Sequence, residues 1–343
     1  MSYKRVVITK FGGPDVLQVV EEAALPEPQP GEVRIKVLAT SAAFTDTMIR
    51  KGIYPGTRGK KPPFSPGYDL VGVVDKLGEG VTKLKIGQKV AELTVIGAYA
   101  EYICLHEDRL VPVPDELDAA EAVSMILTYI TAYQMMHRLA HIHKGQRILV
   151  HGAGGAVGTA LLQLGKTLDL EMYGTGSTSK QDLIASLGAT PIDYRTEDFV
   201  ERIRHLTGAG GDGGVDAAFD CINGKTFNGS FSLLKTGGTL VWYGMQLNSM
   251  WETLPLPFDM ARLYLRTWFS NTRSTKFYSI APWREDHADW FHEDLTALFG
   301  LLSQGKLNPV IDRRMSLDEA AHAHELIEQA AVKGKIVLVM NDQ

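Results

Sequence analysis

The sequence predicts a two-domain α/β protein in which a doubly wound parallel sheet is joined to an irregular β-barrel-like domain. Strands and helices alternate between residues 147 and 244, which is typical of a parallel sheet with helices on both faces. Short strand-like runs punctuated by Gly and Pro fill the first 113 residues. The chain of 343 residues also exceeds the size of one ordinary core, which favours two domains.

The first domain is expected to consist of short strands separated by turns. Alternating apolar residues predict strands at 4–9, 17–21, 32–39, 70–75, 88–92, 98–105 and 110–113. The prolines at 26, 28 and 30 predict an extended connector before the third of these strands.

The second domain begins with a helix. Asp118 and Glu121 have the spacing of a helix start, and an apolar helix is expected to about Leu139. The predicted elements that follow are strand 147–151, helix 156–168, strand 170–175, helix 179–187, strand 190–193, helix 197–207, strand 215–221, helix 225–234 and strand 239–244.

The pattern loosens after Gly244. An edge strand is expected at 266–273, followed by helix 289–305, strand 307–314, a helix from 316 to about 332, and a closing strand at 335–340. These pieces do not extend the doubly wound sheet, and we expect them to return to the first domain. The expected domains are therefore residues 1–123 with 275–343, and residues 124–274.

Composition narrows the classes of partner. The formal net charge is −5 and no block of Lys or Arg stands out, which argues against nucleic acid or an anionic membrane as the main partner. No apolar run reaches the length of a membrane span, and no signal-peptide pattern begins the chain. We therefore expect a cytoplasmic protein that acts on a small molecule.

The segment from Arg147 to Gly158 is the most informative stretch of the chain. A short apolar strand runs into a glycine-rich turn, and the turn runs into an apolar helix. Glycines at such a turn let the backbone approach a pyrophosphate, and the helix N-terminus then faces the phosphates. The expected dinucleotide contacts are Ala153, Gly154, Gly155, Ala156, Val157 and Gly158. A purely structural corner is the alternative, but it does not explain the clustering of three glycines.

The end of the second strand indicates which dinucleotide binds. An acidic residue at this place usually binds the ribose of NAD, and this chain has none there. Thr175, Ser177, Ser179 and Lys180 offer hydroxyl groups and a cation instead, which suit a 2′-phosphate. We therefore predict NADPH, with Tyr194 and Gly244 as further cofactor contacts. A plain polar loop with a serine helix cap is compatible with the same residues.

Several segments together resemble the medium-chain dehydrogenase/reductase superfamily, and more narrowly its zinc-independent quinone oxidoreductases and enoyl reductases. The matching segments are residues 11–17, 46–55, 66–74, 153–158, 192–195 and 333–338. The resemblance covers nearly the whole chain. It implies a Rossmann cofactor domain, a GroES-like catalytic domain and an NADPH-dependent oxidoreductase.

The resemblance also argues against a catalytic metal. Zinc-dependent relatives place ligands where this chain has Ala43, Tyr68 and the region near Leu127. None of these residues is a usual zinc ligand, so we expect no metal. Many quinone oxidoreductases carry an asparagine at the position of Ala43, and its absence weakens the assignment of a quinone as substrate.

Tyr54 is the leading candidate for catalysis. It matches the tyrosine that faces substrate in the enoyl reductases, and a phenol can donate a hydrogen bond or a proton to an enolate oxygen. A half-buried turn aromatic is the alternative. Phe44, Tyr68 and Thr128 are expected to line the substrate pocket, whereas Asp46 is expected to cap or orient the helix that follows it.

Three functions remain open from the sequence. The first is an NADPH-dependent reductase that transfers hydride to a quinone or another α,β-unsaturated carbonyl. The second is an enoyl-thioester reductase, for which Arg50, Lys51, Arg58, Lys60 and Lys61 would supply a basic groove. The third is a non-catalytic NADPH-binding protein. A homodimer is expected, because an unpaired edge strand at 266–273 would be protected by pairing with its copy.

Overall fold

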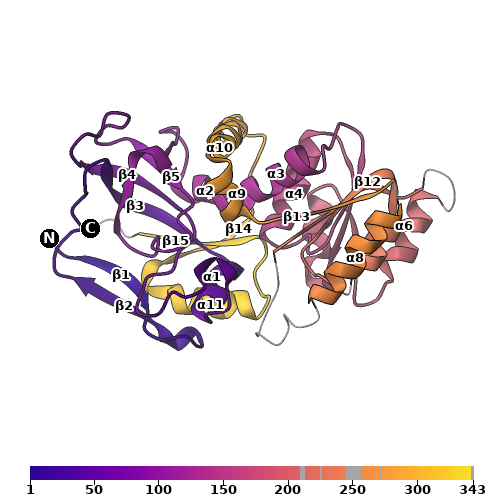
Figure 1. Ribbon diagram of the computed structural model, residues 1–343, viewed down its shortest axis with the longest axis horizontal. Helices are drawn as coiled ribbons and strands as arrows, with labels where there is room; N and C mark the ends of the chain where they lie inside the picture. The colour runs from indigo at the N-terminus through magenta and orange to yellow at the C-terminus, as the bar shows by residue number, and fades with distance from the viewer. Residues whose placement is uncertain (209–212, 225, 245–255, 271, 341–343) are drawn as a thin grey trace. The chain divides into compact units, whose positions relative to one another are not determined.

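The computed structural model describes residues 1–208, 213–224, 226–244, 256–270 and 272–340. The chain forms two compact units (Figure 1), one made of residues 1–130 and 281–343 and the other of residues 131–280. Each unit has its own sheet and its own buried core.

The first unit contains a hairpin and a seven-stranded sheet. The hairpin is β1 (Tyr3–Ile8) with β2 (Leu17–Glu22). The sheet runs β14 (Ile311–Ser316), β15 (Lys335–Val339), β3 (Glu32–Ala42), β4 (Leu70–Leu77), β5 (Lys89–Glu92) and β7 (Val111–Pro112), with β6 (Tyr102–His106) paired to β3. Because β15 pairs antiparallel with β3, the C-terminal strands β14 and β15 complete the sheet of the first unit.

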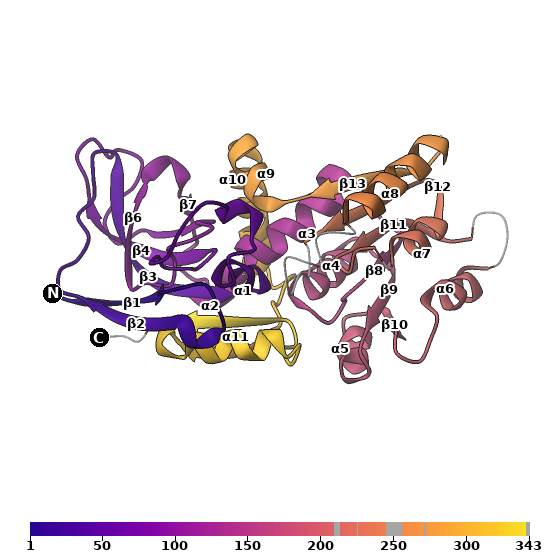
Figure 2. The same cartoon turned by 60° about the horizontal axis from the view of Figure 1, so that its bottom comes forward.

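Two helices of the first unit are joined by buried charge. α1 (Phe44–Arg50) and α11 (Ala320–Glu328) lie side by side (Figures 1 and 2). Arg50 is fully buried and donates to Glu328 at 2.6 Å and to Nδ1 of His324 at 3.4 Å. The same unit holds α2 (Ala119–Ser124), α9 (Ile280–Asp286) and α10 (Ala288–Ser303).

The second unit is built on a six-stranded parallel sheet. Its order is β10 (Thr190–Asp193), β9 (Glu171–Gly176), β8 (Arg147–Val150), β11 (Val215–Asp220), β12 (Leu234–Tyr243) and β13 (Ser274–Tyr278). The chain order reverses direction between β8 and β11, which is the point where such sheets bind ligands. The flanking helices are α3 (Ile130–Gln134), α4 (Ala156–Thr167), α5 (Gln181–Ser186), α6 (Phe199–Thr207), α7 (Phe227–Ser232) and α8 (Leu256–Ser270).

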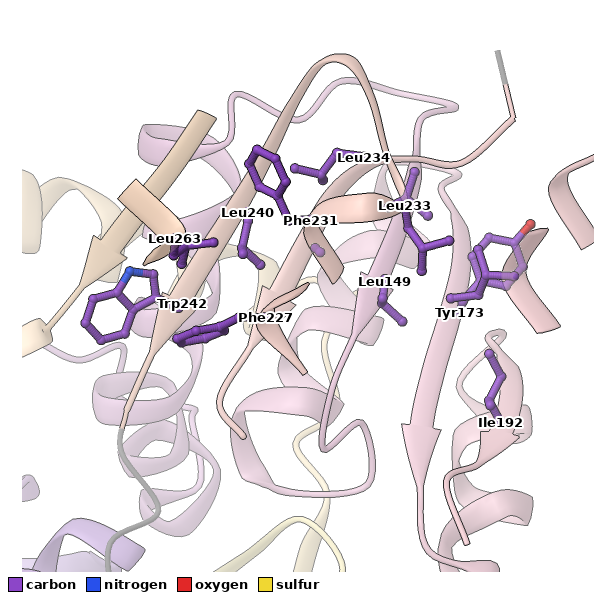
Figure 3. Close-up of a cluster of buried hydrophobic side chains, with 13 residues drawn as sticks. Leu149, Tyr173, Ile192, Phe227, Phe231, Leu233, Leu234, Leu240, Trp242 and Leu263 are labelled. Carbon is purple, nitrogen blue, oxygen red and sulfur yellow. The ribbon is translucent and has the colours of Figure 1, made fainter. Parts of the chain in front are cut away.

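A buried apolar cluster covers one face of this sheet (Figure 3). Strand residues such as Leu149, Tyr173 and Trp242 pack there with Phe227 of α7 and Leu263 of α8. Burial of large side chains is the main stabilising contribution to such a layer. The doubly wound parallel sheet and the separate β-rich unit confirm the predicted fold class.

Two expectations about single elements are wrong. Residues 266–270, expected to begin an edge strand, belong to the helix α8. The edge strand is β13 at Ser274–Tyr278, and it extends the parallel sheet beside β12, which we did not expect of any segment after Gly244. A helix satisfies its own backbone hydrogen bonds, and Leu263 of α8 is buried in the core of this unit. The helix expected over 118–139 is interrupted by π-helical segments at Met125–Tyr129 and Met135–Leu139.

Candidate functional site

The glycine-rich turn of the second unit follows β8 directly. Gly152 has φ = 64°, a left-handed conformation that favours glycine, and Gly155 precedes the first turn of α4. A Cβ atom on Gly158 would lie 2.3 Å from the carbonyl oxygen of Gly152, so only glycine lets α4 approach the turn this closely. Ala156 and Val157 form the first helical turn, where no side chain caps the backbone N–H groups. This geometry suits a phosphate group.

Lys180 extends across the glycine turn. A Cβ atom on Gly154 would lie 2.7 Å from Cδ of Lys180, which places the stem of the lysine over that glycine. The hydroxyl groups of Ser177 and Ser179 lie 3.3 Å apart in the same loop after β9. The neighbouring carboxylate of Asp193 already accepts from Thr178 Oγ1 and from the backbone N–H of Arg195. The loop therefore gathers hydroxyl groups and a cation, while the carboxylate of Asp193 is occupied by other donors.

The remaining predicted cofactor residues are not all in this loop. Thr175 is buried, and its hydroxyl bonds His151 Nδ1 at 2.9 Å. Tyr194 is 57% exposed after β10, and Gly244 is exposed at the end of β12. The structure thus brings together Gly154, Ser177 and Lys180, but it assigns the Thr175 hydroxyl to an internal bond that the sequence did not suggest.

The carboxyl edge of this sheet fits a dinucleotide. Alongside the glycine turn, the buried side-chain oxygen of Asn223, just after β11, has no hydrogen-bond partner within the described structure. An unpaired buried acceptor is rare in proteins and is commonly satisfied by a ligand or water. Asn223 also has φ = 68°, a left-handed conformation that is uncommon for residues other than glycine. The residues at this edge therefore fit a bound dinucleotide.

In the first unit, the predicted residues Tyr54 and Tyr68 contact each other. Their hydroxyl oxygens are 2.5 Å apart, and their rings meet edge to face at 5.8 Å. Tyr68 is buried, while Tyr54 is half-buried in the turn after α1. Burial is the largest influence on Tyr54 and raises its pKa, so the phenol keeps its proton at neutral pH.

The side chains of two buried aspartates, Asp46 and Asp69, fix the backbone on either side of Tyr68. The backbone N–H of Gly67 donates to Asp46 Oδ1 at 3.2 Å. Asp69 Oδ1 accepts from the hydroxyl of Ser41 at 2.6 Å and from its backbone N–H at 2.9 Å. Asp46 also accepts from the N–H of Ala43 at 3.0 Å, which confirms that it orients the start of α1. The position of Tyr68, and through it Tyr54, is therefore set by acidic residues beneath the pair.

The sequence interpretation missed Lys335, a cation in the same cluster. Its Nζ atom lies 2.9 Å from the hydroxyl of Thr128 and 3.4 Å from Asp69 Oδ2, and the side chain is buried. Burial raises the pKa of Asp46 to about 8, with a further contribution from the nearby Asp69. Burial also lowers the pKa of Lys335. Lys335 is separated from Asp69 by 266 residues, so no local pattern pointed to it.

Thr128 and Phe44 complete the predicted set. Thr128 is buried in the π-helical segment Met125–Tyr129, and such segments are frequent at functional sites. Phe44 is partly buried as the first residue of α1. Within the described residues, no group of three or more His, Cys, Asp or Glu side chains is arranged to hold a metal ion. No helix of the described part is long and apolar enough to cross a membrane.

Comparisons with known proteins agree with this architecture. The family model of the alcohol dehydrogenase GroES-like domain matches residues 29–115, and that of zinc-binding dehydrogenase matches residues 187–338. The synaptic vesicle membrane protein VAT-1 homolog of Danio rerio is 31% identical over 98% of this chain and 70% of its own length. The quinone oxidoreductase of Pongo abelii is 28% identical over 98% of both chains.

A solved structure gives the same result. The Escherichia coli quinone oxidoreductase complexed with NADPH has a TM-score of 0.85 and 27% identity, and the match covers 98% of this chain and 99% of that one. The fold and these relatives define an oxidoreductase built from a GroES-like unit and a Rossmann unit. The chain belongs to the medium-chain dehydrogenase/reductase superfamily, in its quinone oxidoreductase-like branch.

Proposed function

We propose that this protein is a zinc-independent, NADPH-dependent reductase of quinones or other α,β-unsaturated carbonyls. The observation that carries the proposal is the hydroxyl pair of Tyr54 and Tyr68, whose backbone is held by the side chains of two buried aspartates. Tyr68 stands where zinc-dependent relatives carry a metal ligand. In the proposed reaction, a tyrosine hydroxyl takes the place of the metal as the group that stabilises negative charge on the substrate oxygen.

The proposed role of Tyr54 follows from the charge that the reaction creates. When bound, NADPH supplies the hydride. Addition of hydride to the β-carbon leaves negative charge on the carbonyl oxygen, and one preorganised donor at such an oxygen contributes about 3–4 kcal/mol. Tyr54 donates to that oxygen and then delivers its proton. Tyr68 donates to Tyr54 and stabilises the phenolate that forms.

NADPH is proposed over NADH because of the loop after β9. Ser177, Ser179 and Lys180 present hydroxyl groups and an ammonium group beside the glycine turn, where a 2′-phosphate gains charge-assisted hydrogen bonds. The NADPH complex of the similar E. coli enzyme supports the same choice.

Zinc independence is proposed from the types of side chain present. Catalytic zinc requires three converging nitrogen, sulfur or oxygen ligands. The corresponding positions hold Ala43, Tyr68 and Leu127, of which two have no donor atom in the side chain. The phenol of Tyr68 is engaged with Tyr54.

The basic residues near Tyr54 favour a small acceptor over a carrier-bound thioester. Arg50 is buried and paired with Glu328, and Lys51 pairs with the same carboxylate at 2.7 Å. Both were candidates for binding carrier phosphates, and both are engaged within the protein. Only Arg58, Lys60 and Lys61 of that group remain exposed. The enoyl-thioester reductase therefore ranks second.

The proposal is tested by following NADPH oxidation with a panel of small quinones and enones, beside a short enoyl thioester and beside NADH. We expect turnover with NADPH on the small acceptors. Faster turnover on the thioester would select the second function, and NADPH binding without turnover on any acceptor would favour a non-catalytic cofactor-binding protein.

We further propose that the enzyme acts in the cytoplasm as a homodimer. No described strand pairs with the outer side of β13, the last strand of the parallel sheet. Phe277 on that strand is 41% exposed, and Trp268 and Phe269 on α8 are about four-fifths exposed. An open edge beside exposed aromatic side chains suits an isologous contact with a second copy of the chain.

A further inference from the structure

A chain of four buried polar side chains crosses the carboxyl edge of the parallel sheet. His151 Nδ1 lies 2.9 Å from Thr175 Oγ1, and His151 Nε2 lies 2.9 Å from Ser230 Oγ. Ser230 Oγ in turn donates to Asp220 Oδ2 at 3.1 Å. All four residues are at most 3% exposed. The chain thus links the ends of β9, β8 and β11 with helix α7.

Asp220, the acidic residue at one end of this series of hydrogen bonds, determines which group donates in each bond. Asp220 Oδ1 accepts from the N–H of Ile222 and from the hydroxyl of Thr226, so the carboxylate acts as an acceptor. The hydroxyl of Ser230 has one proton and donates it to Oδ2 of Asp220. Its oxygen therefore accepts a hydrogen bond from Nε2 of His151. Burial lowers the pKa of His151, which keeps the imidazole neutral. Nδ1 is then the acceptor, and the hydroxyl of Thr175 is its donor.

The sheet register explains why these residues meet. Val150 pairs with Gly174 on one side and with Phe219 on the other. The next residues along the three strands are His151, Thr175 and Asp220, whose side chains point to the same face. That face carries the apolar cluster of Figure 3, and Phe199 packs edge-on against the imidazole at 4.8 Å.

The histidine is also continuous with the glycine turn. Gly152 follows it directly, and the N–H of His151 donates to the carbonyl oxygen of Phe219 at 3.0 Å. The N–H of Ala153 donates to the carbonyl oxygen of Thr175 at 2.9 Å. The side-chain and backbone bonds therefore fix the turn between the two halves of the sheet, at the point where its strand order reverses.

We propose that His151 is a positioning residue for the cofactor and that Thr175 acts through His151 rather than on the 2′-phosphate. The inference rests on the cofactor half of the proposed function. The hydroxyl of Thr175 orients the imidazole, and the imidazole holds the turn that receives the pyrophosphate. NADPH and NADH share the pyrophosphate, so these hydrogen-bonded side chains support the binding of both cofactors equally.

The test measures the dissociation constants of NADPH and NADH separately, by fluorescence titration of the full-length protein. Thr175→Val keeps the shape of the side chain and removes its hydroxyl. We expect both dissociation constants to rise about tenfold, the effect of one lost hydrogen bond, with an unchanged NADPH/NADH ratio. Thr175→Ser restores the hydroxyl and should return both constants to within about threefold of the original values.

A pair of histidine variants tests the other end of the chain. His151→Asn places an amide near the position of Nδ1, whereas His151→Gln reaches the position of Nε2. Each variant keeps one bond and loses the other, so each should weaken both cofactors by a similar factor. His205→Asn, an exposed histidine of α6 in the same unit, is the matched control and should change neither constant.

Two results would overturn the inference. A Thr175→Val variant that loses affinity for NADPH alone would place the hydroxyl on the 2′-phosphate. Unchanged binding of both cofactors in Thr175→Val, His151→Asn and His151→Gln would give these hydrogen bonds no role in cofactor binding. A protein that binds NADPH but reduces no acceptor would contradict the proposed reductase. The proposed role of His151 would still be tested, because the dissociation constants do not depend on turnover.

Discussion

The hydroxyl of Tyr54 is the group on which the proposed chemistry depends most. We predict that Tyr54→Phe lowers kcat about 10²-fold, because it removes the donor that meets the developing negative charge. Tyr68→Phe should lower kcat about tenfold, since Tyr54 keeps its proton but loses its supporting bond. Steady-state kinetics with NADPH and the best acceptor provide the measurement. Tyr3→Phe, on β1 of the same unit, is the control, and a kcat unaffected by Tyr54→Phe would remove this residue from the mechanism.

We expect Lys180 to carry the preference between the two cofactors. We predict that Lys180→Met, which keeps the aliphatic stem over Gly154, weakens NADPH binding tenfold or more and leaves NADH binding nearly unchanged. Separate titrations of the two cofactors measure the ratio. Equal losses for both would show that the lysine does not contact the 2′-phosphate.

At the scale of single residues, the sequence points to residues that stand beside a recognisable motif. It predicts Tyr54 and Tyr68 separately, and the structure places their hydroxyl groups in contact. It does not point to Lys335 and Asp69, because their pairing depends on β15 reaching the sheet beside β3. His151 stands within the glycine motif itself, but its partners on β9 and α7 are visible only in the folded chain.

At the scale of elements, the close approach of α4 to the glycine turn after β8 explains why residue 158 is a glycine. We predict that Gly158→Ala destabilises the protein by about 2 kcal/mol or more and impairs NADPH binding, since its Cβ would meet backbone atoms at 2.3 and 2.6 Å. Gly300→Ala in α10 is the matched control. Its Cβ has 4.0 Å of clearance, and alanine should stabilise that helix by up to about 1 kcal/mol. Thermal unfolding compares the two variants, and equal effects would contradict the steric account.

The buried contact between α1 and α11 predicts sensitivity to acid. Burial and the nearby Arg50 lower the pKa of His324 from 6.5 to about 3. Between these values the unfolded chain binds a proton that the native protein does not. The free energy of unfolding therefore falls as the pH drops below about 6.5, by up to about 1.4 kcal/mol per pH unit. His324→Asn, which keeps an acceptor for Arg50, should flatten this dependence.

The comparison between variants isolates His324 from other titrating groups. Asp46 acts in the opposite direction, because its pKa of about 8 lets the native state bind a proton between about pH 4 and 8 that the unfolded chain has released. His322→Asn on the same helix changes an exposed histidine and should leave the pH profile of thermal unfolding as it was. Identical profiles for the original protein and His324→Asn would exclude this histidine as the cause.

The elements of the parallel sheet were predictable because alternation of strands and helices is a local and repeated signal. α8 was not, since several of its described apolar residues lie on the surface: Phe258, Leu265 and Trp268 are 58–80% exposed. A pattern that identifies the buried face of an element misleads where the apolar face is outside. The π-helical segments could not be predicted either, because their pattern of apolar residues does not differ visibly from that of an α-helix.

At the scale of the whole molecule, the exposed aromatic surface predicts assembly. We expect light scattering to give twice the mass of one chain. Phe277→Glu, on the open edge strand, should shift the mass toward a monomer because it places a charge within the contact. Ile86→Glu, on an exposed residue of the first unit, should not. A monomeric mass for the unaltered protein at working concentration would contradict the proposed dimer.

The claim that the protein transfers hydride from NADPH to an activated alkene is tested most directly by isotope transfer. NADPH deuterated at both C4 positions is supplied with a small enone, and the product is analysed by mass spectrometry. We predict one deuterium atom at the β-carbon of the reduced product. Oxidation of the cofactor without deuterium in the product would contradict the proposed reductase. So would a failure to reduce the enone or an acceptor of any other class.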